Sequence, residues 1–127
     1  MDLKLADKLA LVTGSTKGIG LAIASALVRE KSRVVINGRT EKSVETGLSE
    51  VLAAVPGAKI EGFVGDLSTS QAAESLAKQF PSLDILVNNL GIFEPKPFDE
   101  IPDDDWRRFF EVNVLAVFAS AADTCLA

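Results

Sequence analysis

Residues 13–20 read TGSTKGIG and place three glycines within eight positions. This segment directly follows the apolar run LALV, residues 9–12, and directly precedes apolar residues at helical spacing. A glycine turn at the start of a helix lets a phosphate approach the main-chain N–H groups without meeting a Cβ atom. The order of strand, turn and helix therefore predicts a β-α-β unit that binds a phosphate. A tight turn that only requires positive φ is the alternative interpretation.

The rest of the chain continues the alternation of strands and helices. Short apolar runs rich in β-branched residues predict strands over residues 9–12, 33–37, 59–64 and 84–87. Helical spacing predicts a first helix over about 18–31, and Thr40 as N-cap with Pro56-Gly57 as the stop predicts a second. Ser68 in a capping box with Gln71 begins a third helix that ends at Pro81. Asp103 is the expected cap of the fourth helix. Four β-α units predict an α/β protein with a parallel sheet covered on both faces. We expect a single domain over residues 1–127.

Apolar side chains at helical spacing indicate the buried face of each helix. For the first three helices these residues are Ile19, Ala22, Ile23, Ala26 and Leu27; Val44, Leu48, Val51, Leu52 and Val55; and Ala73, Leu76, Ala77 and Phe80. The last helix carries the stripe Trp106, Phe109, Phe110, Asn113, Val114, Val117, Phe118 and Ala121. We expect this stripe to pack against the sheet, with contact to a partner protein as the alternative.

The composition narrows the class of protein. The formal net charge is -5 and no basic patch is present, so we do not expect nucleic acid as a partner. The longest apolar stretch, residues 114–122, falls short of the roughly 20 residues of a membrane span. Cys125 is the only cysteine, and an apolar secretory core is absent after Met1, which favours a cytoplasmic location. The chain contains no His and no Tyr, two side chains often used for proton transfer.

Four motifs in the right order resemble those of the short-chain dehydrogenase/reductase family. The glycine turn is similar to the family's TGxxxGxG loop, and residues 88–91 (NNLG) are similar to its NNAG element, with Leu90 in place of alanine. Asp66 in GDL and Asn113 in EVNV match two further family positions. The resemblance implies a Rossmann-type sheet of strand order 3-2-1-4. It also implies hydride transfer between NAD(H) or NADP(H) and a hydroxyl or carbonyl group of a small-molecule substrate.

The resemblance also implies which residues contact the cofactor. Gly14, Gly18 and Gly20 hold the pyrophosphate, together with Ser15, Thr16, Lys17 and Ile19 from the same turn. Asp66 and Leu67 lie near the adenine ring, and Asn89 and Gly91 border the nicotinamide side of the cleft. Asn113 matches a member of the family's catalytic group, and no metal is implied. From the residues alone, the alternatives are a local turn or helix cap for Asp66, strand-end hydrogen bonds for Asn88 and Asn89, and a satisfied core position or a kink with bound water for Asn113.

The charge at the end of the second strand favours NADP over NAD. Rossmann proteins that use NAD usually place an acid about 20 residues after the glycine turn to bind the ribose 2′-hydroxyl. Here Gly38 takes that place, and Arg39 follows with a planar guanidinium suited to a phosphate. Lys17 adds a second cation nearby. Solvated surface charges are the alternative interpretation of Arg39 and Lys17.

The remaining catalytic residues of the family have no counterpart in this sequence. The family's proton donor is Tyr in a Tyr-x-x-x-Lys motif, and its catalytic Ser follows a fifth strand; the chain matches only the first half of the family domain, as if truncated before strands five to seven. We therefore expect an NADP-dependent oxidoreductase whose cofactor-binding half is inactive alone. A non-catalytic nucleotide-binding pseudoenzyme and an interaction fragment are the alternatives. Strand 84–87 would then be an exposed sheet edge, which makes a homo-oligomer possible.

Overall fold

The computed structural model of the chain describes residues 1–92 and 94–115. Four parallel strands, β1 (Leu9–Val12), β2 (Arg33–Gly38), β3 (Ile60–Val64) and β4 (Ile85–Val87), form one sheet in the order β3-β2-β1-β4. The helices are α1 (Gly18–Arg29), α2 (Glu41–Ala54), α3 (Ser70–Gln79) and α4 (Asp103–Phe110). A 3-10 turn, η1 (Phe98–Glu100), precedes α4, and a π-helical turn, η2 (Glu111–Leu115), follows it. The predicted α/β class and strand order are confirmed.

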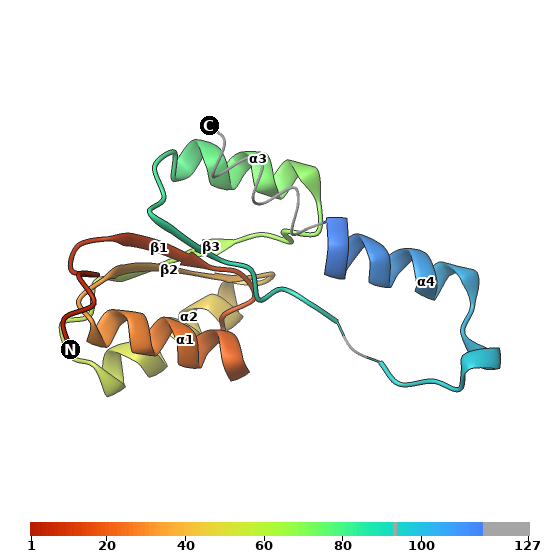
Figure 1. Cartoon of the computed structure of the whole chain (residues 1–127), viewed down its shortest axis with the longest axis horizontal. Coiled ribbons are helices and arrows are strands. Elements are labelled where there is room, and N and C mark those ends of the chain that lie inside the picture. Colours follow the sequence, from red (N-terminus) through yellow and green to blue (C-terminus); the bar gives the residue numbers. More distant parts are fainter. Residues whose placement is uncertain (93, 116–127) are drawn as a thin grey trace.

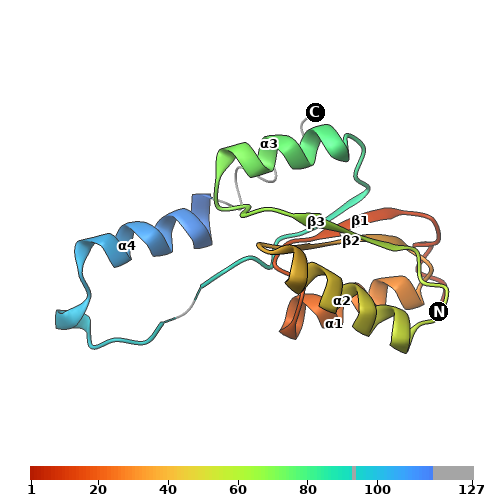
Figure 2. The same cartoon turned by 180° about the vertical axis from the view of Figure 1, so that it is seen from behind.

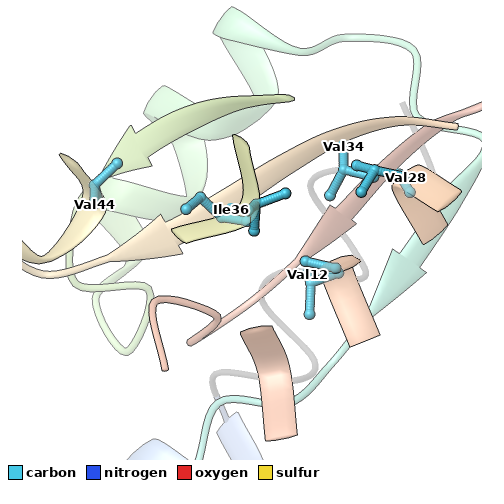
Figure 3. Close-up of a cluster of buried hydrophobic side chains, with 8 residues drawn as sticks. Val12, Val28, Val34, Ile36 and Val44 are labelled. Carbon is cyan, nitrogen blue, oxygen red and sulfur yellow. The ribbon is translucent and has the colours of Figure 1, made fainter. Parts of the chain in front are cut away.

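The sheet lies between two helical layers, with α1 and α2 on one face and α3 on the other (Figures 1 and 2). Successive side chains of a strand point to opposite faces, so Ala10 and Val12 belong to one core and Leu11 to the other. The core under α1 and α2 is built largely from valines, including Val28 and Val34 (Figure 3). The core under α3 contains the larger side chains Phe63, Leu67, Leu76 and Phe80.

The capping signals identify one helix start correctly and miss two. The Thr40 side chain accepts a hydrogen bond from the Ser43 N–H, as predicted for the N-cap of α2. The prediction of Ser68 as the next N-cap is wrong, because Thr69 caps α3 and the Ser68 hydroxyl instead donates to Asp66. Asp103 is also not a cap. The extended backbone of Pro102 places Asp103 inside the first turn of α4, where its carboxylate is favoured by the helix dipole.

The face of α1 that packs on the sheet differs from the predicted one. The buried positions are Gly20, Ala24 and Val28, whereas Ile19 is 75% exposed and Ala22 and Ala26 are also exposed. Only Ile23 and Leu27 of the predicted stripe pack partly against the core. A glycine and an alanine lack bulk, so the helix approaches the strands most closely on its small side chains. In α2 the same effect buries Gly47 and leaves Leu52 exposed.

The last described helix does not pack as expected. After β4 the chain extends beyond the carboxyl ends of the strands, and α4 lies beside the layers rather than on either face (Figures 1 and 2). Trp106 and Phe110 are 53% and 54% exposed, so the prediction that their stripe packs on the sheet is wrong for these residues. Phe98 packs edge-on against Trp106, with 6.0 Å between the ring centroids. The predicted positions Val117, Phe118, Ala121 and Cys125 lie outside the described residues.

The strand order leaves β3 and β4 as the two edges of the described sheet. β4 pairs with β1 alone, through Ile85 with Ala10 and Val87 with Val12. Its side chains are half-buried, which agrees with the predicted edge position. Among residues 1–92 and 94–115, none of the helices has the length and apolar character needed to cross a membrane.

Candidate functional site

An open cleft of about 1020 Å³, including the solvent at its mouth, lies at the carboxyl ends of the strands. Its walls come from the glycine turn, the β2–α2 junction, residues 65–68 and residues 90–92, with Val112 of η2. In open parallel sheets, ligands bind outside the carboxyl ends at the point where the strand order reverses, here between β1 and β4. The lining includes seven predicted site residues: Gly14, Thr16, Lys17, Arg39, Asp66, Leu67 and Gly91.

The other predicted residues of the turn do not line this cleft. Gly14 and Gly18 have φ of 57° and 61°, a conformation that favours glycine. Gly20 is required by space instead, because a Cβ atom there would lie 2.6 Å from both the Gly14 carbonyl oxygen and Asn89 Nδ2. Ser15 is fully buried behind the turn, and Ile19 is exposed beside it. The glycine pattern therefore combines two left-handed positions with one close contact.

The start of α1 is left without a side-chain cap. Lys17 occupies the N-cap position with an extended backbone, and its side chain makes no capping hydrogen bond. The first turn of α1 also contains no acidic residue. The free N–H groups and the partial positive charge of a helix N-terminus favour an anion. The glycine turn thus presents an uncapped helix start next to the cleft.

A buried polar network fixes the turn to the end of β2. Asn37, only 2% exposed, accepts a hydrogen bond from the Gly14 N–H at 3.1 Å. Its amide nitrogen donates to the carbonyls of Phe63 at 3.2 Å and Gly65 at 3.1 Å. Ser15 exchanges two bonds with Asn37, through its main-chain N–H and its hydroxyl oxygen. One side chain therefore joins the glycine turn, β2 and the loop that carries Asp66.

A second set of hydrogen bonds joins the turn to the segment after β4. The Thr13 hydroxyl oxygen accepts from the main-chain N–H groups of Asn89 at 2.9 Å and Leu90 at 3.0 Å. Asn89 donates from Nδ2 to the Gly14 carbonyl oxygen at 3.1 Å. The strand-end role weighed for Asn89 is thus present in the structure. No described side-chain hydrogen bond involves Asn88, which is exposed.

The charged side chains around the cleft differ in their partners. Lys17 and Arg39 are exposed, and neither forms an ion pair with any residue in the ranges 1–92 and 94–115. Asp66 is also exposed, and its Oδ1 accepts from the Ser68 N–H at 3.0 Å and from the Ser68 hydroxyl at 2.6 Å. The local-turn role of Asp66 is therefore formed. The other carboxylate oxygen, Oδ2, accepts no hydrogen bond from the described residues.

Asn113 follows the cleft-lining residue Val112 and holds the segment after Gly91. Its Oδ1 accepts from the Ile92 N–H at 2.8 Å, and its Nδ2 donates to the Ile92 carbonyl at 3.1 Å. Both halves of the amide are thus used, as the satisfied-core alternative requires. Asn113 also sits in the π-helical turn η2, the kind of local irregularity that is common at functional sites.

Ion pairs tie the segment after Gly91 to α4. Lys96 bonds Asp105 and lies 3.2 Å from Glu94 Oε1, while Arg108 bonds the other oxygen of Glu94. The hydrogen bond from Arg108, followed by that from Lys96, holds the pKa of Glu94 below its ordinary value of 4.5. The bond to Asp105, followed by that to Glu94, raises the pKa of Lys96 above its ordinary value of 10.5. These ion pairs join the segment to α4, and none of the four charged residues lines the cleft.

Sequence reasoning missed two polar residues that build the site, Thr13 and Asn37. Both stand directly after an apolar strand run, at 9–12 and 34–36. A polar residue that ends a buried strand must find hydrogen-bond partners, and in a parallel sheet the neighbouring strand ends supply them. That pattern was the available signal. No group of His, Cys, Asp and Glu among the described residues is arranged to hold a metal.

Comparison with known proteins identifies what this arrangement resembles. The model of the short chain dehydrogenase family matches residues 8–125. Among curated proteins, the uncharacterized oxidoreductase YvaG of Bacillus subtilis is 49% identical over 116 residues, which are 91% of this chain and 44% of YvaG.

Solved structures give the same picture. A point variant of actinorhodin polyketide ketoreductase with NADPH has a TM-score of 0.85 at 33% identity and covers 93% of this chain and 46% of that one. L-Sorbose reductase of Gluconobacter frateurii, complexed with NADPH and L-sorbose, has a TM-score of 0.88 at 28% identity, with coverage of 99% and 49%. The chain spans less than half the length of each of these relatives.

Proposed function

The chain belongs to the short-chain dehydrogenase family, and on that premise we propose that its cleft binds NADP(H) as part of an NADP-dependent oxidoreductase. The reaction class is hydride transfer between NADP(H) and a hydroxyl or carbonyl group of a small molecule. The observation that carries the proposal is the uncapped start of α1 beside two exposed cations, Lys17 and Arg39. Together they suit a ligand with phosphates at two separate points.

The residues present fit such a dinucleotide. The glycine turn offers main-chain N–H groups to a pyrophosphate, and a side chain at Gly20 would push Asn89 and the Gly14 carbonyl out of place. Gly14, Thr16, Asp66, Leu67 and Gly91 all line the cleft. When bound, the nicotinamide supplies or accepts the hydride. The chain's own residues bind and orient the nucleotide.

The preference for the 2′-phosphorylated form rests on the end of β2. Gly38 leaves that strand without the acid that binds a ribose 2′-hydroxyl, and Arg39 follows it at the rim of the cleft. Lys17 lines the same cleft from the glycine turn. The NADPH in the two similar structures supports a cofactor with a 2′-phosphate for this chain as well.

Asn113 is proposed to contribute by position. Its two bonds to the Ile92 main chain fix the segment that leaves the cleft at Gly91. The 127 residues contain no Tyr and no His, two side chains often used for proton transfer. That composition favours a second candidate function, a nucleotide-binding protein without catalysis.

Titration with NADPH and NADH tests the proposal, with Arg39→Ala as the decisive variant. Loss of a charge-assisted hydrogen bond should weaken NADPH binding by about 1.5–3 kcal/mol, or roughly 10- to 150-fold, and leave NADH binding nearly unchanged. Arg33→Ala is the matched control, because Arg33 is an exposed arginine at the opposite end of the same strand. Equal losses for both nucleotides would contradict the assignment of Arg39.

Turnover assays and the coding sequence together separate the two functions. NADPH oxidation with a panel of small ketones and aldehydes would show the oxidoreductase directly. Saturable NADPH binding without oxidation is expected both of a cofactor-binding half alone and of a non-catalytic protein; a coding frame past residue 127 that encodes Tyr-x-x-x-Lys then favours the oxidoreductase, and a stop codon there favours the non-catalytic alternative. If NADPH and NADH both fail to bind at millimolar concentration, the cofactor site itself is wrong.

A further inference from the structure

Thr16 is packed between two glycines that come from different elements. A Cβ atom at Gly38, the last residue of β2, would lie 2.5 Å from Thr16 Cγ2. A Cβ atom at Gly47 of α2 would lie 3.3 Å from both the Cα atom and the carbonyl oxygen of Thr16. The glycine turn therefore reaches over the end of β2 and against α2 only because both positions lack a side chain.

Position 38 is closed by space and not by backbone conformation. The glycines with positive φ are Gly14, Gly18 and Gly57, and Gly38 lies in extended strand with Gly65 N–H bonded to its carbonyl. On the other side, a Cβ atom at this position would lie 2.8 Å from Ser43 Oγ. Two hydrogen bonds with Thr40, each 2.9 Å long, hold that oxygen in place. An added side chain would meet Thr16 and Ser43 at once.

We propose that Thr16 and Ser43 form a steric gate that excludes a side chain from position 38 and so excludes the acid that an NAD site requires there. This inference rests on the proposed NADP function and deepens it, because it adds two specificity-determining residues that bear no charge. Arg39 favours the 2′-phosphate, whereas the gate prevents the competing arrangement for a free 2′-hydroxyl. A change of cofactor would then require the gate to open before an acid is introduced.

The gate is tested first without any nucleotide, by thermal unfolding of Gly38→Ala in three backgrounds. In the otherwise unchanged chain, forcing a methyl group into this contact should lower the Tm by about 3–10 °C. In Thr16→Ser/Ser43→Ala, which removes the two nearest obstructing atoms and leaves Val44 Cγ2 at 3.1 Å from the added Cβ, Gly38→Ala should cost less than half as much. The control background Thr46→Ser/Ser49→Ala makes the same chemical changes at exposed positions of α2 and should keep the full loss.

Equal losses of Tm in all three backgrounds would overturn the gate. If Gly38→Ala abolishes cooperative unfolding in the unchanged chain, the Thr16→Ser/Ser43→Ala background, called the opened background, must restore it. The control background must not. Absence of that restoration also overturns the gate. These comparisons follow the logic of a double-mutant cycle, in which only the interaction between the exchanged positions remains.

Calorimetric titration with NAD and NADP then tests the role in specificity. Gly38→Asp in the opened background should bind NAD at least about ten-fold more tightly than Gly38→Asp in the closed one, because only there does the carboxylate fit beside the ribose. Equal NAD affinity in both backgrounds would overturn that role. Failure of the unchanged protein to bind either nucleotide refutes the proposed function, while the melting comparison still decides the gate.

Discussion

Asn37 gives the sharpest test of how the cleft is held together. Replacement by alanine leaves the Gly14 N–H and the carbonyls of Phe63 and Gly65 without their side-chain partner. Each lost hydrogen bond is worth about 0.5–1.5 kcal/mol, and unpaired buried groups cost more. Water from the cleft can replace part of the loss, since Gly14 and Gly65 are only partly buried. We expect Asn37→Ala to lower the free energy of unfolding by about 2–4 kcal/mol.

The isosteric change Asn37→Asp separates hydrogen bonding from shape. An aspartate keeps an acceptor for the Gly14 N–H but turns an oxygen toward two carbonyl oxygens that now receive N–H bonds at 3.2 Å and 3.1 Å. Burial and these carbonyls disfavour the charged form, so the pKa of the introduced carboxyl is raised above the unfolded value of about 3.9. The folded state then holds a proton that the unfolded state releases. Stability relative to the unchanged protein must fall as the pH rises above about 4, by up to about 1.4 kcal/mol per pH unit.

Urea unfolding followed by circular dichroism between pH 4.5 and 7.5 measures this slope. Asn88→Asp is the matched control, because Asn88 is exposed and should show little dependence on pH. A stability difference for Asn37→Asp that stays constant over this range would refute the reasoning. So would an Asn37→Ala variant within about 0.5 kcal/mol of the unchanged protein, since a network that contributes so little does not fix the turn.

Two further predictions concern the segment after β4. Thr13→Val removes the oxygen that accepts the Asn89 N–H, so urea unfolding should show a loss of about 1–2 kcal/mol and amide exchange at Asn89 should accelerate; unchanged exchange would contradict this. Acidification should loosen the contact between residues 94–96 and α4. The bond from Arg108 keeps the pKa of Glu94 below 4.5, so the ion pairs of Glu94 are intact above that pH. They are lost as the pH falls through the lowered value. Fluorescence of Trp106, the only tryptophan, should follow that step, and Glu94→Gln should abolish it.

The sequence predicts the sheet well because its signals are local. Short apolar runs, the glycine turn and one threonine cap define the strands and the starts of α1 and α2, and these signals depend on neighbouring residues along the chain. The buried face of α1 was missed because packing there depends on how closely two elements approach. Gly20 and Ala24 bring the helix near the sheet, and no count of apolar side chains identifies a face by its lack of bulk.

The candidate site was predictable in part for the same reason. The glycine pattern and the cations at positions 17 and 39 can be recognised in the sequence, and the structure brings both to one cleft. The role of Asn37 depends on three strand ends that meet only in the folded sheet. The exposure of α4 was likewise not predictable. An apolar stripe shows which face of a helix is suited to packing, but it does not show which element packs against that face.

The glycine turn presents peptide groups to the cleft, while the exposed Lys17 and Arg39 have no ion-pair partner within the described part of the chain. The residues that hold the shape of the turn are therefore distinct from the residues that set the charge of the cleft. Lys17 and Arg39 can be exchanged one at a time. Ser15 and Asn37 must change together, because they share hydrogen bonds. Single substitutions can therefore alter the charges that a ligand meets in the cleft, whereas the packing at position 38 and the buried hydrogen bonds restrict the shape of its site.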